Sequence, residues 1–145
     1  MIRFVPAVLV FALICWVIDL ANRGGHNPLL GVLLSLPLGD KLGHFLLYGG
    51  LAGLLDWAWR QRNTRLPLMG PVPTAAWVVL AFSALEEVTQ LFTATRSPDV
   101  VDLLANLLGV GAFCACGRWV ARWRAGLSAP CARTRSCPRR PPQPE

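Results

Sequence analysis

Apolar residues fall into four long stretches, which short polar segments separate along the chain. The stretches cover about residues 4–20, 41–59, 74–93 and 99–121. A helix rises about 1.5 Å per residue, so about 20 apolar residues cross the roughly 30 Å hydrocarbon core of a bilayer. Each stretch comes close to that length. The pattern therefore predicts an all-α membrane protein with four transmembrane helices.

Composition supports this prediction, because 54% of the 145 residues are hydrophobic and only 15% are charged. Soluble domains are less apolar and more charged. A lone Arg3 before the first stretch would also fit a secretory signal peptide, but no small-x-small cleavage site follows directly. We therefore expect a transmembrane domain over residues 1–122. The basic, proline-rich residues 123–145 predict a disordered cytoplasmic tail.

The segment HNPLLGVLLSLPLGD separates the first two stretches. Asn27 suits the N-cap of a helix, and Pro28 suits its first position. The apolar run that follows, at about ten residues, is too short to span a bilayer. It predicts a short interfacial helix at the outer surface.

Basic residues predict the orientation of the bundle. If both termini lie in the cytoplasm, eleven arginines fall on the inner face and three basic residues on the outer face. The inner set is Arg3, Arg60, Arg62, Arg65, Arg118, Arg122, Arg124, Arg133, Arg135, Arg139 and Arg140. Such a bias marks the cytoplasmic side, so we expect a multi-pass protein of the inner membrane. The net charge of +6 then indicates attraction to anionic lipid heads, not nucleic-acid binding.

Polar residues recur within the apolar stretches at the ends that this orientation places outside. The expected binding residues are Asp40, Lys41, His44, Tyr48, Glu87, Gln90, Arg96, Asp99, Asp102 and Asn106. Carboxylates deep in hydrocarbon are costly, so such residues face the bundle interior or a wet cavity. We predict an outward-facing polar pocket. Its floor comprises Glu87, Gln90 and Asn106, and its rim comprises Asp40, Lys41, Arg96 and Asp99.

Some of these positions also have a purely structural explanation. Asp40 and Asp99 begin predicted helices, where a carboxylate answers free backbone N–H groups. Glu87 and Asp102 would fit an internal lock with an arginine. Glu86 lies about 100° around the helix from Glu87, so we expect only one of the two to point straight into the pocket.

Two further patterns predict helix packing. Gly49, Gly50 and Gly53 lie within an apolar stretch and predict close contacts between helices. Asp56 lies four residues before Arg60, which predicts an ion pair at the inner surface.

The polar positions resemble the pattern of the VanZ-like family of small bacterial membrane proteins. That pattern is Asp-Lys-x-x-His followed by Tyr or Phe, then Glu-x-x-Gln, then Arg-x-x-Asp-x-x-Asp-x-x-x-Asn-x-x-Gly. The matching positions are Asp40, Lys41, His44, Tyr48, Glu87, Gln90, Arg96, Asp99, Asp102, Asn106 and Gly109. The resemblance covers about residues 37–117, with no departure at a motif position.

The resemblance implies a role in the cell envelope. The founding member of the family is associated with low-level resistance to teicoplanin, a lipoglycopeptide antibiotic that acts outside the cytoplasmic membrane. Our first hypothesis is that the pocket binds, or modulates access to, an envelope lipid or lipid-linked component, with an effect on glycopeptide susceptibility as one outcome. The partners expected are membrane lipids, a lipid-linked envelope intermediate or a lipoglycopeptide. Lys41 and Arg96 would hold an anionic group at the mouth.

Two rival hypotheses use the same residues. In a small intramembrane enzyme, His44 would act as base and Glu87 or Asp102 as acid, and these groups could ligate a divalent metal. No nucleophile motif or phosphate-binding loop supports a reaction, so the enzyme ranks second and the sequence requires no cofactor. Proton-coupled transport ranks third, because four short helices would need a homo-oligomer to form an alternating-access path.

Overall fold

The computed structural model describes residues 2–22, 38–92 and 99–128, and 82% of these residues are helical. A short 3-10 helix, η1 (Ile2–Phe4), leads into α1 (Val5–Asn22). The remaining helices are α3 (Gly39–Ala58), α4 (Thr74–Gln90) and α5 (Val100–Ser128). A hairpin of β1 (Asn63–Leu66) and β2 (Gly70–Pro73) joins α3 to α4. The four α-helices coincide with the four predicted stretches.

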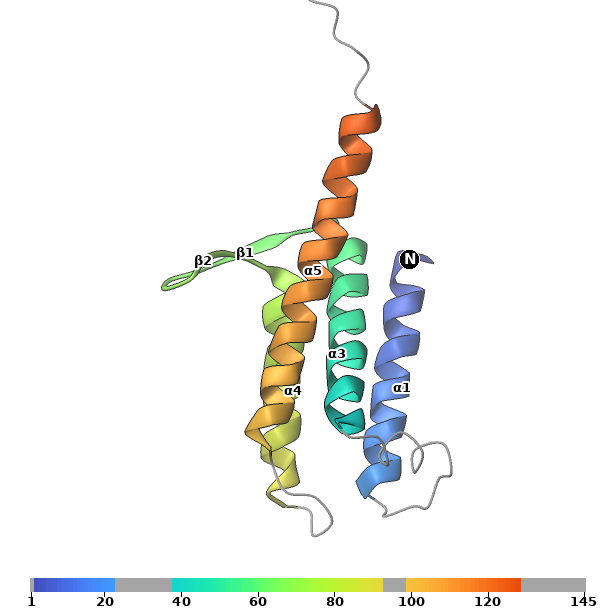
Figure 1. Cartoon of the computed structure of the whole chain (residues 1–145), viewed down its shortest axis with the longest axis vertical. Coiled ribbons are helices and arrows are strands. Elements are labelled where there is room, and N and C mark those ends of the chain that lie inside the picture. Colours follow the sequence, from blue (N-terminus) through green and yellow to red (C-terminus); the bar gives the residue numbers. More distant parts are fainter. Residues whose placement is uncertain (1, 23–37, 93–98, 129–145) are drawn as a thin grey trace, which may run out of the picture.

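Helix α3 occupies the centre of the bundle, since it packs against α1, α4 and α5 (Figure 1). Helices α1 and α4 run opposite to α3, whereas α5 runs parallel to it. Hydrogen bonds between α3 and α5 join residues 62 positions apart at two levels, from His44 to Asn106 and from Asp56 to Arg118. This constant separation shows that the two parallel helices stay in register along their contact.

The backbones of α3 and α5 touch at glycines. A Cβ atom added to Gly49 would lie 2.8 Å from the carbonyl carbon of Gly109, and one added to Gly109 would lie 2.9 Å from the carbonyl carbon of Phe45. No side chain fits in such a space. A Cβ added to Gly53 would lie 3.3 Å from Phe113 Cβ, so the close contacts predicted at Gly49 and Gly53 are confirmed. The one predicted at Gly50 is wrong, because no described atom lies within 4 Å of a Cβ built there.

The hairpin is an element that the hydrophobic pattern does not predict. Leu66 pairs with Gly70, which leaves residues 67–69 as the loop. The N–H of Met69 donates to the Leu66 carbonyl at 3.3 Å, and Gly70 follows with a φ of 72°. A turn followed by a left-handed glycine is a common three-residue hairpin loop. The strands escape detection because they are short and because β2 contains Pro71 and Pro73, which are unusual in strands.

Asp56 pairs with Arg118 of α5, so the predicted pair with Arg60 is wrong. The Nε and Nη2 atoms of Arg118 donate to the two Asp56 oxygens at 2.8 Å each, which makes the pair bidentate. Arg118 Nη1 also donates to Asn63 Oδ1 at 2.6 Å and so fixes the hairpin to α5. Helix α3 ends at Ala58 and Arg60 has a φ of 56°, so Arg60 no longer lies on the helix face that carries Asp56.

Helix α5 extends to Ser128, beyond the predicted end at about residue 121. Residues 123–128, which were predicted to belong to a disordered tail, are therefore helical. Alanine, arginine and leucine in this segment favour a helix, and the first proline after it is Pro130. The remainder of the predicted tail and the predicted interfacial helix after Pro28 lie outside the described residues.

The outward surface of the bundle is apolar. Leu9 and Trp16 of α1 are 64% and 55% exposed, and Leu108 of α5 is 66% exposed. Two helical segments, Ile2–Asn22 and Val100–Leu127, are long and apolar enough to cross a membrane. Extended apolar surfaces of this kind mark contact with a membrane or another protein.

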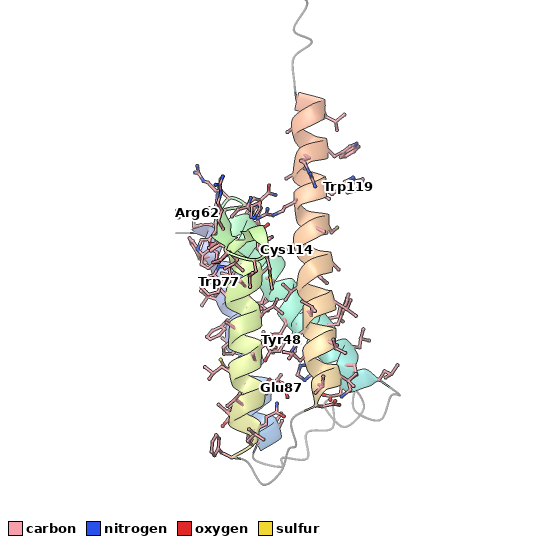
Figure 2. All side chains as sticks on the ribbon, turned by 90° about the vertical axis from the view of Figure 1, so that its left-hand side faces the viewer. Tyr48, Arg62, Trp77, Glu87, Cys114 and Trp119 are labelled. Carbon is pink, nitrogen blue, oxygen red and sulfur yellow. The ribbon has the colours of Figure 1, made fainter. Side chains whose placement is uncertain are left out.

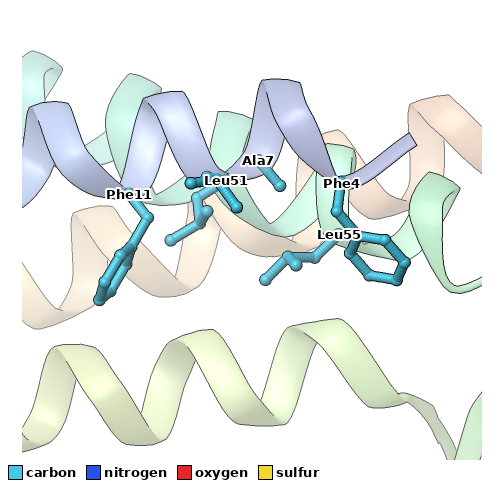
Figure 3. Close-up of a pocket in the computed structure, with 6 residues that line it drawn as sticks. Phe4, Ala7, Phe11, Leu51 and Leu55 are labelled. Atoms are coloured by element: carbon cyan, nitrogen blue, oxygen red, sulfur yellow. The ribbon is translucent and has the colours of Figure 1, made fainter. Parts of the chain in front are cut away.

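An apolar cavity of about 150 Å³ lies between α1 and α3 (Figure 3). Phe4, Ala7 and Phe11 line it from η1 and α1, and Leu51 and Leu55 line it from α3. All of these side chains are apolar, so the cavity is chemically distinct from the polar residues at the opposite end of α3.

The substitution Gly109→Ala should destabilise the bundle, because the new methyl group would overlap the Phe45 carbonyl and push α3 and α5 apart. Overpacking of this kind costs about 1–3 kcal/mol. The matched control is Gly111→Ala on the same helix, where no described atom lies within 4 Å of an added Cβ. It should gain roughly 0.5–1 kcal/mol from helix propensity. Denaturant unfolding in detergent compares the two variants, and equal stabilities would contradict the backbone contact.

Candidate functional site

The structure brings the predicted site residues of α3, α4 and α5 together at one end of the bundle. Nine of the ten predicted residues are described, and Arg96 lies outside the described residues. Two further side chains, Ser83 and Glu86, join them through hydrogen bonds. We call this set the polar cluster. Its members are Asp40, Lys41, His44, Tyr48, Ser83, Glu86, Glu87, Gln90, Asp99, Asp102 and Asn106.

Lys41 forms the half-exposed edge of the cluster together with three carboxylates. Its ammonium lies 2.6 Å from Asp99 Oδ2 and 3.5 Å from Asp40 Oδ2. It also contacts Asp102 Oδ1, an oxygen with no other hydrogen-bond partner. That contact compensates the buried Asp102 charge although its geometry falls outside a regular hydrogen bond. The side chains of Asp40, Asp99 and Lys41 are 41%, 40% and 25% exposed, which fits the predicted rim.

The two expected helix caps differ from each other. Asp99 precedes α5 and its Oδ1 accepts from the backbone N–H of Val101 at 2.8 Å, so its capping role is confirmed. Asp40 instead lies inside the first turn of α3, and the N-cap position belongs to Leu38, which makes no side-chain cap.

A chain of hydrogen bonds crosses the floor of the cluster. The Nδ1 atom of His44 lies 3.2 Å from Asn106 Oδ1, and Asn106 Nδ2 donates to Ser83 Oγ at 2.6 Å. An amide oxygen only accepts, so Nδ1 carries the hydrogen in the neutral ring and Nε2 keeps its lone pair. His44 Nε2 lies 3.7 Å from Asp102 Oδ2 and 3.9 Å from Asp40 Oδ1. The chain therefore fixes the imidazole with its free nitrogen toward carboxylates.

Glu86 belongs to the cluster, contrary to the expectation that only one of the two neighbouring glutamates would enter it. Its Oε1 accepts from Gln90 Nε2 at 2.7 Å, and its Oε2 accepts from the Tyr48 hydroxyl at 3.1 Å. Glu86 is directed toward α3 while Glu87 reaches the start of α5, so both helix faces are used. The spacing of Glu86 and Gln90, four residues apart, was the signal in the sequence that could have identified it.

Glu87 is buried to 8% exposure and extends from α4 toward the start of α5 (Figure 2). Its Oε2 accepts from the backbone N–H of Asp99 at 3.2 Å. Its Oε1 is buried and has no hydrogen-bond partner. Most buried polar atoms in proteins are paired, so this oxygen points to an interaction beyond those of the described residues.

Acidic groups outnumber basic ones in the cluster. Among the described residues it holds five carboxylates, those of Asp40, Glu86, Glu87, Asp99 and Asp102, against the single ammonium of Lys41. Two groups of side chains, one of Asp40, His44 and Asp102 and one of His44, Glu86 and Glu87, have ligand atoms close enough to hold a metal ion. Buried carboxylates without partners are costly, so the cluster favours either cations or protonation.

The VanZ/LLP1 family profile matches residues 4–121, which include every residue of the polar cluster. The chain belongs to the VanZ/LLP1 family. The match confirms the family resemblance found in the sequence. Membership in the VanZ/LLP1 family and the two apolar helices together point to a membrane protein. The sequence matches no curated protein and no solved structure.

The substitution Ser83→Ala should destabilise the protein by about 1–3 kcal/mol, because it leaves the buried Asn106 amide without its acceptor. Thr89→Val on the same helix is the matched control, since that hydroxyl donates only to a carbonyl of its own helix, at Glu86. The control should change stability by less than Ser83→Ala does. Unfolding in detergent measures both, and an undisturbed Ser83→Ala variant would show that the chain does not hold the cluster together.

Proposed function

We propose that the chain is a multi-pass inner-membrane protein in which four helices cross the bilayer and both termini face the cytoplasm. The apolar outward surface of α1 and α5 supports this proposal, because lipid can cover it. Arg65 lies in the hairpin and Arg62 directly precedes it, at the end opposite the polar cluster, as the excess of basic residues on cytoplasmic faces requires. The polar cluster would then lie within the outer leaflet.

We further propose that the polar cluster binds the polar head of an envelope lipid or lipid-linked component. The observation that carries this proposal is a set of polar side chains with a half-exposed rim, placed at the end of a bundle whose outward surface is apolar. A lipid tail could follow the apolar surface while its head meets Asp40 and Asp99. Binding there would alter access to lipid-linked components and, by that route, glycopeptide susceptibility.

The contacts of Lys41 indicate which kind of head group the cluster could bind. An anionic group was expected at Lys41, but the ammonium contacts Asp40, Asp99 and Asp102. An anion would have to displace one of these carboxylates. Hydroxyl or amino groups could instead donate to the exposed oxygens of Asp40 and Asp99 without breaking the ion pairs. The rim therefore favours a head rich in hydrogen-bond donors, such as a sugar or an amine.

An intramembrane enzyme acting on a lipid head group is the alternative. The hydrogen bond that orients His44 and the buried, partly unpartnered Glu87 favour it, because a fixed base near an acid is the arrangement that proton transfer requires. Turnover of a head group would separate this function from binding alone.

The proposed orientation predicts opposite labelling of the two ends. Leu68 at the hairpin tip is 98% exposed and Phe92 after α4 is 86% exposed, so cysteines at these sites can react without unfolding. In a chain whose five native cysteines are replaced, Phe92→Cys should react with a membrane-impermeant maleimide in intact cells. Leu68→Cys should react only after permeabilisation. The reverse pattern would overturn the orientation, and labelling of both in intact cells would overturn the four-helix crossing.

Lipid binding predicts a co-purified molecule that depends on the rim. Native mass spectrometry of protein released gently from membranes should show a bound lipid in wild type. Asp99→Asn should lower its occupancy about tenfold or more, since a hydrogen bond to a charged group contributes about 1.5–3 kcal/mol. The matched control is Asp19→Asn, which removes an exposed carboxylate of α1 outside the cluster. Equal lipid loss in both variants, or no bound lipid in wild type, would count against the proposal.

A further inference from the structure

Three buried side chains of the polar cluster form a compact set of metal-ligand groups. His44 from α3 and Glu86 and Glu87 from α4 are 8%, 6% and 8% exposed. One ligand atom of each lies within 4.8 Å of those of the other two. We infer that these three residues bind a divalent transition-metal ion. This inference rests on the side-chain geometry and does not depend on the proposed lipid binding.

The unpartnered oxygen of Glu87 is the first argument. Glu87 Oε1 is buried and accepts no hydrogen bond from the described residues, whereas Oε2 is held by the backbone N–H of Asp99. Burying a polar oxygen without a partner is unfavourable, and more so when the group is charged. A metal ion between Glu87 and His44 would supply the missing partner and neutralise the charge.

The hydrogen bonds around His44 are the second argument. Histidines that ligate metals usually donate their other ring N–H to a carbonyl or carboxylate, which fixes the tautomer and the ring orientation. Here Asn106 Oδ1 accepts from Nδ1, and Ser83 in turn fixes Asn106 through a hydrogen bond of 2.6 Å. The ring stacks on Tyr48 at 5.7 Å between centroids, which limits its rotation further. The imidazole is thus held in one orientation with the lone pair of Nε2 free for a metal ion, and this nitrogen also lies 3.7 Å from Asp102 Oδ2.

Glu86 is oriented in the same way. Tyr48 and Gln90 each donate to one of its oxygens. These donors would hold the Glu86 carboxylate in place as the ion binds.

The neighbouring group of Asp40, His44 and Asp102 is less suited to a metal. Lys41 already contacts one oxygen of each of these two aspartates. A divalent ion beside them would meet the repulsion of that ammonium. Glu87 Oε1, by contrast, is buried without a hydrogen-bond partner, so the group that includes it favours the ion more strongly.

The donor set indicates the class of ion. Imidazole suits zinc and iron, and carboxylates suit manganese and magnesium, so one imidazole with two carboxylates favours divalent ions of intermediate character such as Zn²⁺ and Mn²⁺. Three protein ligands leave at least one position for water or another small molecule, since both ions bind at least four ligands.

The test is a titration of detergent-solubilised, metal-free protein with Mn²⁺, followed by electron paramagnetic resonance, with Zn²⁺ as competitor. Wild type should bind one equivalent, and the bound Mn²⁺ should show nitrogen coupling from a histidine. The chain has two histidines, so His26→Ala is the matched control: it should keep the coupling, and His44→Gln should lose it.

Variants of the carboxylates distinguish the two possible groups. Changes in the hydrogen-bond partners of metal ligands cost about 10- to 100-fold in affinity, so loss of a ligand in Glu87→Gln should weaken Mn²⁺ binding at least as much. Asp40→Asn should bind like wild type, because Asp40 belongs only to the other group. If Glu87→Gln does not fold, Glu86→Gln and the coupling in wild type decide the same question.

Three outcomes would overturn the inference. The first is that wild type shows no saturable binding of either ion. The bound ion could lack nitrogen coupling from His44. Finally, Asp40→Asn could abolish binding while Glu87→Gln retains it, which would move the ion to the aspartates. A lipid bound by metal-free wild type would leave the proposed function standing in each case.

Discussion

The backbone contact between α3 and α5 is the constraint on which the polar cluster depends. Gly109 packs against the Phe45 carbonyl group with no space for a side chain, so the two helix axes approach closely. Only at this separation can His44 bond to Asn106 on one side of the contact. On the other side, the same separation lets Arg118 bond to Asp56. Both links span the same interface, so a wider gap would break them together.

The close packing of α3 and α5 places polar side chains inside the bundle and leaves its outward surface apolar. Each hydrogen bond at the interface replaces one that water would otherwise make. Asn106 illustrates this, because it is fully buried yet bonded to both His44 and Ser83. Two buried oxygens lack a hydrogen bond: Asp102 Oδ1 still contacts the ammonium of Lys41, whereas Glu87 Oε1 has no hydrogen-bond partner. An unpaired oxygen beside satisfied neighbours indicates a site for a ligand more than a defect in packing.

The sequence predicted the helices and most of the cluster because both depend on local spacing. Residues three or four apart share a helix face whatever the helix packs against, so His44 and Asn106 could be assigned to facing surfaces in advance. Pairing between residues far apart in the sequence could not be predicted in this way. Asp56 had a partner at helical spacing in Arg60, but the register of α3 and α5 brought Arg118 closer. The hairpin was missed because its strands are short and β2 contains two prolines, and because its hydrogen bonds to Arg118 join residues far apart in the sequence.

The charge of the cluster connects the two proposals. Without a metal ion, five carboxylates face the single ammonium of Lys41 among the described residues, and an anionic head group is repelled. A divalent ion at His44 would cancel two of these charges and weaken that repulsion. Linkage is reciprocal, so an anionic ligand that prefers the metal-loaded cluster must raise its metal affinity by the same factor. A head group that only donates hydrogen bonds to Asp40 and Asp99 would show little such coupling. The charge state of the buried floor thus decides which head groups the rim can accept.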